Sequence, residues 1–259
     1  MIPPAIELAF CALFGLCVGS FLNVVIGRLP AGRSIVRPGS SCPRCGNPIA
    51  WYDNLPIFSF LLLRARCRSC REPISWRYPT VELLCAVLFV MAYVRFGPGS
   101  HLASALVLLS ALVAITGIDL DHQIIPDLLS LPGVAFALLL SLAPGAIGWK
   151  ASALGVLVGA GVFLVIIGAS SLALGQPGMG GGDVKLGAML GAFLGWKLAL
   201  LSILISVLVG GLLAGALLAT GRKGRKEPIP FGPFLALGGA ISLFWGDATL
   251  AWYFAQFQD

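Results

Sequence analysis

Two short acidic motifs stand next to apolar segments, where carboxylates are uncommon. Asp119 lies in GIDLDHQIIPD, and Asp183 follows three glycines in GMGGGDVKLGAML. An ionised aspartate inside a spanning helix costs about 2.5 to 3.5 kcal/mol on insertion scales, so it usually faces a polar cavity or a partner. Two aspartates that face each other share one proton, because neighbouring like charges do not both ionise. One carboxylate can then activate water while its protonated neighbour polarises a carbonyl, and no metal is required.

Other polar residues near these motifs have structural as well as functional interpretations. Gly180 and Gly182 free the backbone to approach a ligand closely or to adopt positive φ, so a substrate peptide could bind there in an extended form. Asp127 stands at the start of the next apolar run, where a helix N-cap is favoured. Lys185 is expected to snorkel toward the headgroups or to keep a neighbouring carboxylate ionised. Glu82, in YPTVELL, is expected to make a polar contact within the helix bundle.

Four cysteines form a second group with a definite chemistry. CPRCG contains Cys42 and Cys45, and CRSC contains Cys67 and Cys70 after twenty-one intervening residues. Two CxxC pairs at such a separation match a four-cysteine zinc site with tetrahedral geometry. Two disulfides are the alternative, but they rarely persist in a reducing cytoplasm, where this loop is expected to lie. All four ligands would be sulfur, which leaves no position for water, so the sequence predicts a structural zinc ion.

The elements that position these residues are apolar helices. The chain has 259 residues, of which 58% are hydrophobic and 11% charged, whereas a soluble domain has about a quarter charged residues. The mean hydropathy is +0.95, and a bilayer core needs about 20 apolar residues per helical crossing. We therefore predict an all-α polytopic membrane protein with about eight transmembrane helices. Spans are expected at residues 4–26, 80–97, 102–118, 126–147, 150–174, 184–199, 200–220 and 229–254.

The polar segment at residues 27–79 is expected to be a cytoplasmic zinc-binding loop between the first two spans, inserted within a single membrane-embedded domain at 1–259. Nine of the seventeen lysines and arginines lie between Arg28 and Arg77, and four more lie in RKGRK at 222–226. The positive-inside rule places both segments in the cytoplasm. Six predicted spans separate them, and this even number agrees with the rule.

Both acidic motifs then reach the cytoplasmic membrane face at the same depth, although Asp119 and Asp183 are 64 residues apart in the sequence.

The net charge of +6 is explained by the concentration of basic residues in the cytoplasmic loops and by their attraction to anionic lipids, so no nucleic acid partner is expected. Glycines four residues apart predict close helix packing, and we expect no internal repeat. The glycine pairs are Gly155 with Gly159, Gly187 with Gly191, and Gly211 with Gly215.

The chain resembles bacterial type IV prepilin peptidases through nearly its whole length. The resemblance rests on GSFLNVVIGRLP at 19–30, SCPRCGNPIAWYDNLPIFSFLLLRARCRSC at 41–70, ISWRYPTVELL at 74–84, IDLDHQIIPDLLSLP at 118–132 and GMGGGDVKLGAMLGAFLG at 178–195. GxGD alone is a weak motif, but together with ID before IPD and two ordered CxxC pairs it is specific. Gly27 departs from the pattern, because relatives usually have an aromatic residue before the arginine of RLP.

This resemblance implies a membrane aspartic peptidase that also methylates its product. Asp119 and Asp183 match the family's catalytic pair. The substrate would be a prepilin or pseudopilin whose short basic leader is cut after a glycine, on the cytoplasmic side of the bacterial inner membrane. The new N-terminal amine would then receive a methyl group from S-adenosyl-L-methionine. The sequence shows no soluble nucleotide-binding fingerprint for this methyl donor.

Three other functions are compatible with parts of the sequence. A proton-coupled transporter also uses intramembrane carboxylates and broken helices, but it would place them near the midplane and needs no zinc loop. Another intramembrane aspartic protease of the GxGD type would share the acid pair, but the cysteine loop and the IPD segment speak against it. A structural assembly factor would keep its function without either aspartate.

Overall fold

The computed structural model describes residues 3–175, 178–221 and 229–257, and within them the regular structure is helical apart from two isolated β-bridges. The elements are α1 (Pro4–Arg28), η1 (Trp51–Asn54), α2 (Phe58–Leu62), α3 (Arg77–Phe96), α4 (Ser100–His122), α5 (Asp127–Leu140), α6 (Trp149–Leu174), α7 (Gly181–Ala219) and α8 (Gly232–Ala255). Six of the described helices are long and apolar enough to cross a bilayer, namely α1, α3, α4, α6, α7 and α8. The predicted all-α membrane fold is confirmed. The basic segment at 222–226 lies outside the described residues.

The chain forms two compact units, Met1–Pro98 and Gly99–Asp259. In the first unit α1 packs closely against α3, since a Cβ on Gly19 would lie 2.6 Å from the Glu82 Cα. The Asn23 side chain donates a hydrogen bond of 3.1 Å to the Tyr78 carbonyl across the same interface. The segment between α1 and α3 carries the four cysteines, η1 and α2.

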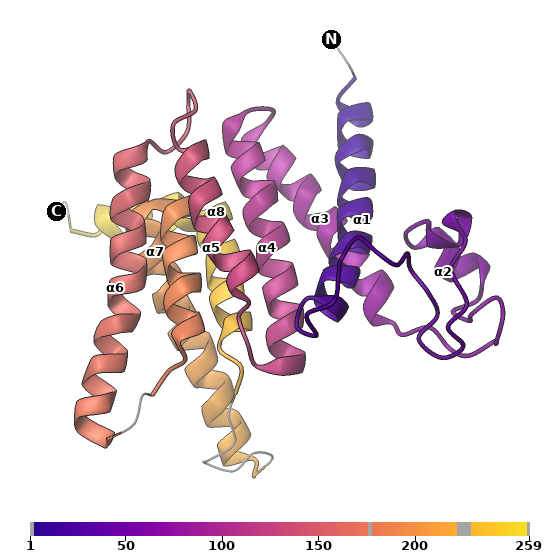
Figure 1. Ribbon diagram of the computed structural model, residues 1–259. Helices are drawn as coiled ribbons and strands as arrows, with labels where there is room; N and C mark the ends of the chain where they lie inside the picture. The colour runs from indigo at the N-terminus through magenta and orange to yellow at the C-terminus, as the bar shows by residue number, and fades with distance from the viewer. Residues whose placement is uncertain (1–2, 176–177, 222–228, 258–259) are drawn as a thin grey trace. The chain divides into compact units, whose positions relative to one another are not determined.

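In the second unit α6 packs against α7 through glycines (Figure 1). A Cβ on Gly155 would lie 2.0 Å from the Gly191 carbonyl oxygen, and one on Gly159 would lie 2.1 Å from that of Gly187. The predicted packing of these two glycine pairs is therefore confirmed. For the pair in GLLAG at 211–215, added Cβ atoms meet no described atom within 4 Å, so that prediction is wrong.

Helix α7 is not straight, because the chain reverses direction at Gly195, where φ is 76° and ψ is 168°. Neighbouring residues of α8 contact α7 on both sides of this point. A Cβ on Gly239 would meet the Leu190 side chain, and one on Gly238 would meet the Ser202 carbonyl oxygen. Twelve residues of straight helix would separate Leu190 from Ser202 by about 18 Å. The two parts of α7 therefore run antiparallel to each other (Figure 1).

The reversal divides α7 into a first arm at residues 181–194 and a second arm at 196–219. These arms correspond to the spans predicted at 184–199 and 200–220. The boundary lies at Gly195 because its positive φ is readily accessible only to glycine. The first arm has fourteen residues and is about 21 Å long, which is less than the thickness of a bilayer core.

Helix α5 is also shorter than the span predicted at 126–147. It has fourteen residues, again about 21 Å. The chain then turns through Pro144 toward α6, with Gly145 and Gly148 at positive φ values of 74° and 84°. The Ser100 hydroxyl donates a hydrogen bond of 3.0 Å to the Pro144 carbonyl, which ties this turn to the start of α4. Proline and glycine thus end the helix before it reaches the length of a full crossing.

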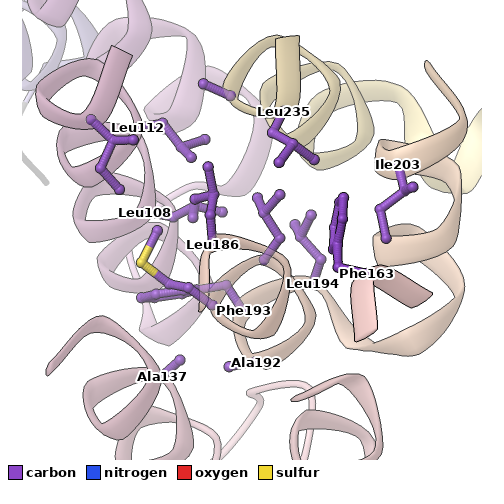
Figure 2. Packing of buried hydrophobic residues seen from close by; sticks show 14 residues of the cluster. Leu108, Leu112, Ala137, Phe163, Leu186, Ala192, Phe193, Leu194, Ile203 and Leu235 are labelled. Carbon is purple, nitrogen blue, oxygen red and sulfur yellow. The ribbon is translucent and has the colours of Figure 1, made fainter. Parts of the chain in front are cut away.

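A buried apolar cluster holds α4, α7 and α8 at a common depth. Leu112 of α4, Leu186 of α7 and Leu235 of α8 point into the same space (Figure 2). A Cβ on Gly239 would contact Leu190 at 2.5 Å and Leu112 at 3.4 Å. Leu112, Leu190 and Gly239 therefore mark one level across three helices, which we call the core level.

Candidate active site and metal centre

The two predicted aspartates lie at the same depth, together with one glycine of α8. On α4, Asp119 comes seven residues after Leu112 of the core level. On the first arm of α7, Asp183 comes seven residues before Leu190, and on α8, Gly232 comes seven residues before Gly239. Each is therefore displaced from the core level by about 10 Å. The three helices place these residues at one level because the packing above fixes their register.

The side chains of the two aspartates are buried, with exposed fractions of 4% for Asp119 and 8% for Asp183. The Gly232 N–H donates a hydrogen bond of 2.9 Å to Oδ2 of Asp119. The Asp183 carboxylate lies close to the Gly180 backbone and is close enough to Asp119 for the two to interact electrostatically. The structure thus brings the two carboxylates near each other and gives Asp119 a backbone donor.

Gly232 is a site residue that the sequence reasoning missed. A Cβ at this position would lie 2.6 Å from Oδ2 of Asp119, so a larger residue would displace the carboxylate. Gly232 is the first residue of α8 and is followed by Pro233. A proline in the first helical turn marks the start of a helix, and this was the available signal. It gave no indication that the preceding N–H would point at an aspartate 113 residues away.

The glycine run before Asp183 differs from its expected conformation. Gly180 is the N-cap of α7 and is extended, with φ −79° and ψ 151°, while Gly181 and Gly182 are already helical. The expectation of positive φ in this run is wrong. Glycine is needed at Gly182 for space instead, because a Cβ there would lie 3.0 Å from the Ile125 Cβ. The absence of a side chain lets the segment between α4 and α5 approach the start of α7.

Asp127 and Lys185 form an ion pair between α5 and α7. The Lys185 Nζ lies 2.5 Å from Oδ1 of Asp127. The expected N-cap role of Asp127 is wrong, because Pro126 occupies the N-cap position and no side chain caps the helix. The second expectation for Lys185 fits better, since its partner is a neighbouring carboxylate. Both side chains are partly exposed, so we expect the pair to contribute no more than about 1 kcal/mol.

Glu82 lies in the first unit, and its partners are there. Its carboxylate accepts a hydrogen bond of 2.8 Å from the Ile57 N–H, just before α2. The Ser20 hydroxyl of α1 lies close to the same carboxylate. The expected polar contact within the bundle is therefore found, and it attaches the cysteine-bearing loop to α1 and α3.

Helix α6 continues well past the level of the aspartates, whereas α4 ends just after Asp119. The pairing of Gly155 with Gly191 and of Gly159 with Gly187 places Phe163 level with Asp183. From Phe163 the helix continues to Leu174, about 16 Å further. By contrast, α4 ends at His122, three residues after Asp119. The carboxylates are thus recessed relative to the end of α6.

The four predicted metal ligands converge in the first unit. The Sγ atoms of Cys42, Cys45, Cys67 and Cys70 all lie within 4.8 Å of one another, and those of Cys42 and Cys70 are 3.8 Å apart. A tetrahedral zinc site with Zn–S bonds of about 2.3 Å requires sulfur atoms about 3.8 Å apart. The cysteines are free and form no disulfide. The donor set could therefore hold a metal ion.

Each CxxC pair lies in the same local structure, so the expectation of no internal repeat is wrong. Residues 41–49 align with residues 66–74, 25 positions later in the sequence. Each stretch forms an antiparallel β-bridge. In each, the N–H of the first cysteine bonds the carbonyl five residues later, at 2.9 and 2.8 Å. The residue after the second cysteine, Gly46 or Arg71, has a positive φ of 73° or 62°.

The local environment shifts the pKa values of two of the thiols in opposite directions. The backbone N–H groups of Cys45 and Arg44 lower the pKa of Cys42 to about 6. The Glu72 backbone acts in the same direction on Cys70, but burial and hydrogen bonds with the other thiols raise the pKa of Cys70 to about 12. A bound metal must displace the remaining protons, because only thiolates ligate it.

Two family models match this chain and cover both units. Residues 13–96 match the bacterial peptidase A24 N-terminal domain, and residues 106–215 match the type IV leader peptidase family. The first match includes the four cysteines, and the second includes Asp119 and Asp183. No solved structure matches the chain.

Curated relatives are similar over nearly the whole length. A prepilin leader peptidase/N-methyltransferase of Aeromonas hydrophila is 40% identical over 278 residues, which cover 98% of this chain and 96% of the relative. One of Bacillus subtilis (strain 168) is 36% identical over 249 residues, covering 95% and 97%. One of Myxococcus xanthus (strain DK1622) is 48% identical over 181 residues, covering 70% and 54%. The buried acid pair, the four-cysteine loop and these matches together show that the chain belongs to the type IV leader peptidase family.

Proposed function

We propose that this chain is a membrane aspartic endopeptidase that removes the leader of prepilins or pseudopilins and then methylates the new N-terminus. The proposal is supported by the name shared by its relatives, prepilin leader peptidase/N-methyltransferase. The single observation that carries the peptidase function is the meeting of Asp119 and Asp183, two buried carboxylates from different helices, at one depth. Family membership favours this function over a transporter or a GxGD protease of another family.

The catalytic roles follow from the chemistry of a carboxyl pair. We expect Asp119 and Asp183 to hold one proton between them, because neighbouring negative charges repel each other. The ionised carboxylate takes a proton from water, which then attacks the scissile carbonyl carbon. The protonated carboxyl donates a hydrogen bond to the carbonyl oxygen, where negative charge develops. The Gly232 N–H fixes the position of the Asp119 carboxylate and so aligns the pair.

We place the site on the cytoplasmic side of the bacterial inner membrane. The support is the concentration of arginine in the segment between α1 and α3, as the positive-inside rule requires. A basic prepilin leader would be held on that side for the same reason, with its apolar helix entering the bilayer. The scissile bond would then lie at the boundary between these two parts of the substrate.

The methyltransferase half of the proposal rests on the family alone. S-adenosyl-L-methionine would supply the methyl group for the new N-terminal amine. We assign no residue to this donor, because no group of the described residues is identified with it. We assign the four cysteines to a structural zinc ion, because sulfur would fill every ligand position.

The test is cleavage of a prepilin peptide with a Gly-Phe junction by the purified full chain, followed by mass spectrometry of both fragments and of the amine. Asp119→Asn and Asp183→Asn should each lower the cleavage rate by about 10² to 10⁴, because each removes one half of the acid–base pair. Asp121→Asn is the matched control, since this residue lies two positions from Asp119 and is exposed. It should cleave at the wild-type rate.

Full processing by both Asn variants would refute the assignment of the acid pair. Detergent-solubilised variants should keep the wild-type melting temperature, which separates loss of chemistry from loss of fold. Methylation is scored separately by adding S-adenosyl-L-methionine to an already cleaved peptide. Product that stays unmethylated in that assay would refute only the methyltransferase half.

A further inference from the structure

Helix α2 presents an apolar face that neither the metal site nor the acid pair explains. It is a single turn, Phe58–Leu62, inside the segment that the sequence predicts to be a polar cytoplasmic loop. Ser59 and Phe60 are buried, whereas Phe58, Leu61 and Leu62 are exposed, with 81% of Leu62 accessible. Three large apolar side chains in one turn form a surface that is costly to leave in water.

The depth of α2 is fixed by its bond to a spanning helix. The Ile57 N–H, just before α2, donates to the Glu82 carboxylate of α3 at 2.8 Å. Glu82 is five residues after Arg77, the start of α3, which is about 7 Å along the helix axis. Gly19 of α1 packs against the same Glu82. In Figure 1, α2 lies to one side of α1 and α3, within the segment that joins them.

Helix α1 gives a second measure of this depth. Gly19 lies nine residues before Arg28, where α1 ends, and this corresponds to about 13 Å. The backbone of Glu82 and Gly19 therefore lies about 7 to 13 Å inside the ends of the two helices, and the Glu82 side chain reaches from this level toward the start of α2. The headgroup layer on each side of a bilayer is about 5 to 7 Å thick. If the two helix ends mark the outer edge of the headgroup layer, this level is near the boundary between headgroups and acyl chains, into which interfacial helices insert.

The residues around α2 have the chemistry of a membrane interface. Trp51 and Trp76 flank the turn in the sequence and are exposed at 80% and 71%. Tryptophan is enriched at the level of the headgroups, where its ring is apolar and its N–H finds a polar partner. Arg64 and Arg66 follow α2 directly and are exposed. Arginines at this level are attracted to the phosphates of anionic lipids.

We propose that α2, together with Trp51 and Trp76, is an interfacial anchor that inserts Phe58, Leu61 and Leu62 into the lipid bilayer at the surface where α1 ends and α3 begins. The four-cysteine loop is then held against the membrane and is not suspended in water. The proposal does not depend on the peptidase function. It depends only on α1 and α3 crossing the bilayer and on the Ile57–Glu82 bond.

The test places a genetically encoded fluorescent amino acid at single positions of the full chain, in vesicles of phosphatidylethanolamine and phosphatidylglycerol. Probes at Leu62 and at Phe58 should be quenched by lipids brominated on the upper acyl chain and shielded from aqueous iodide. Leu83, an exposed apolar residue of α3, is the lipid-facing control. Arg44, exposed between two of the cysteines, is the aqueous control and should respond to iodide. These exposed positions tolerate a probe because none of their side chains packs in a core.

Two results would overturn the proposal. Probes at both Leu62 and Phe58 that respond to iodide and not to brominated lipid would place α2 in water. Lipid quenching that disappears on addition of an excess of prepilin peptide would assign this apolar face to the substrate helix. Quenching at both positions that persists with the peptide supports the lipid anchor.

Discussion

At the scale of single residues, the candidate site depends on the absence of a side chain. The Gly232 N–H holds one oxygen of Asp119, and this is possible only because no Cβ intrudes. The same holds at Gly182, which lets Ile125 approach the start of α7. The acid pair is therefore positioned by backbone atoms and by glycines, while the aspartates supply the chemistry.

We predict that Gly232→Ala disturbs the acid pair without unfolding α8. The added Cβ would lie 2.6 Å from Oδ2 of Asp119, so the carboxylate must move. A displacement of about 1 Å at a reacting group can lower the rate of cleavage by about 10². The rate is measured with the prepilin peptide at saturating concentration.

Gly246→Ala is the matched control for this substitution. Gly246 lies in the same helix, and its added Cβ would meet only the flexible end of Leu198, at 2.6 Å. We expect cleavage by Gly246→Ala to stay near the wild-type rate. Equal rates for the two variants would show that the Gly232 contact does not align Asp119.

The metal loop gives a second prediction at this scale. Gly46 and Arg71 occupy equivalent positions in the two CxxC turns, and both have positive φ. A left-handed conformation costs a residue with a side chain roughly 1 to 2 kcal/mol. Gly46→Ala should therefore speed the loss of zinc to a chelator, and Arg71→Gly should slow it.

Gly39→Ala serves as the control, because this glycine lies in the same segment and its added Cβ meets no described atom. Its φ is not in the left-handed region. Zinc loss from this variant should match the wild type. An Arg71→Gly variant that loses zinc faster than the wild type would contradict the strain argument.

Sequence reasoning found the aspartates and cysteines because their chemistry is legible from residue type and spacing. It missed Gly232 and the partner of Asp127, since both contacts join residues at least 58 positions apart. Of its two alternatives for Gly182, positive φ is wrong, because Gly182 is helical and its lack of a side chain gives space to Ile125. A glycine that provides space and a glycine that provides positive φ look identical in a sequence.

At the scale of elements, two glycine contacts set the register of α6 against α7. Gly155 and Gly159 meet Gly191 and Gly187 so closely that the backbones touch. This register places Phe163 of α6 level with Asp183. Small residues at such contacts act through dispersion, because lipid provides no hydrophobic drive for two helices to associate.

We predict that Gly155→Ala lowers stability. Its Cβ would lie 2.0 Å from the Gly191 carbonyl oxygen, and a backbone atom cannot move away as a side chain can. Overpacking of this kind costs about 1 to 3 kcal/mol. Thermal unfolding of the detergent-solubilised chain should show a lower melting temperature.

Gly161→Ala is the control on the same helix, because its added Cβ meets no described atom within 4 Å. Its melting temperature should match that of the wild type. If both variants unfold at the same temperature, the glycine contact does not hold α6 against α7.

The spans were largely predictable, because apolar length is a strong signal. The reversal at Gly195 fell within an almost unbroken apolar run, so hydropathy placed the boundary only approximately. The early end of α5 depends on Pro144 and the glycines after it, which a hydropathy window averages away. The duplicated CxxC turn is hard to predict, because only the cysteines, a proline and an isoleucine recur at 41–49 and 66–74.

At the scale of the whole molecule, the chemistry is divided between two compact units. The cysteines lie in Met1–Pro98, and the acid pair lies in Gly99–Asp259. Each unit has its own internal packing, and the two family models divide the chain in the same way. Damage to the metal site should therefore act first on the unit that contains it.

We predict one zinc ion per chain and a loss of most of it in Cys42→Ser. Three thiolates cannot complete the tetrahedral set, so the segment between α1 and α3 should become sensitive to protease. Elemental analysis and limited proteolysis measure the two effects. Cys17→Ser is the control, because Cys17 lies in α1 and outside the cluster. A wild-type protein without zinc would refute the metal assignment.

Under the proposed function, the length of α6 beyond the carboxylates can be compared with the length of the substrate leader. An extended peptide covers about 3.3 Å per residue, so the 16 Å from Phe163 to Leu174 corresponds to about five residues. A leader of that size would run from the cut to the tip of α6. We therefore expect a leader shorter than about five residues to end before the tip of α6.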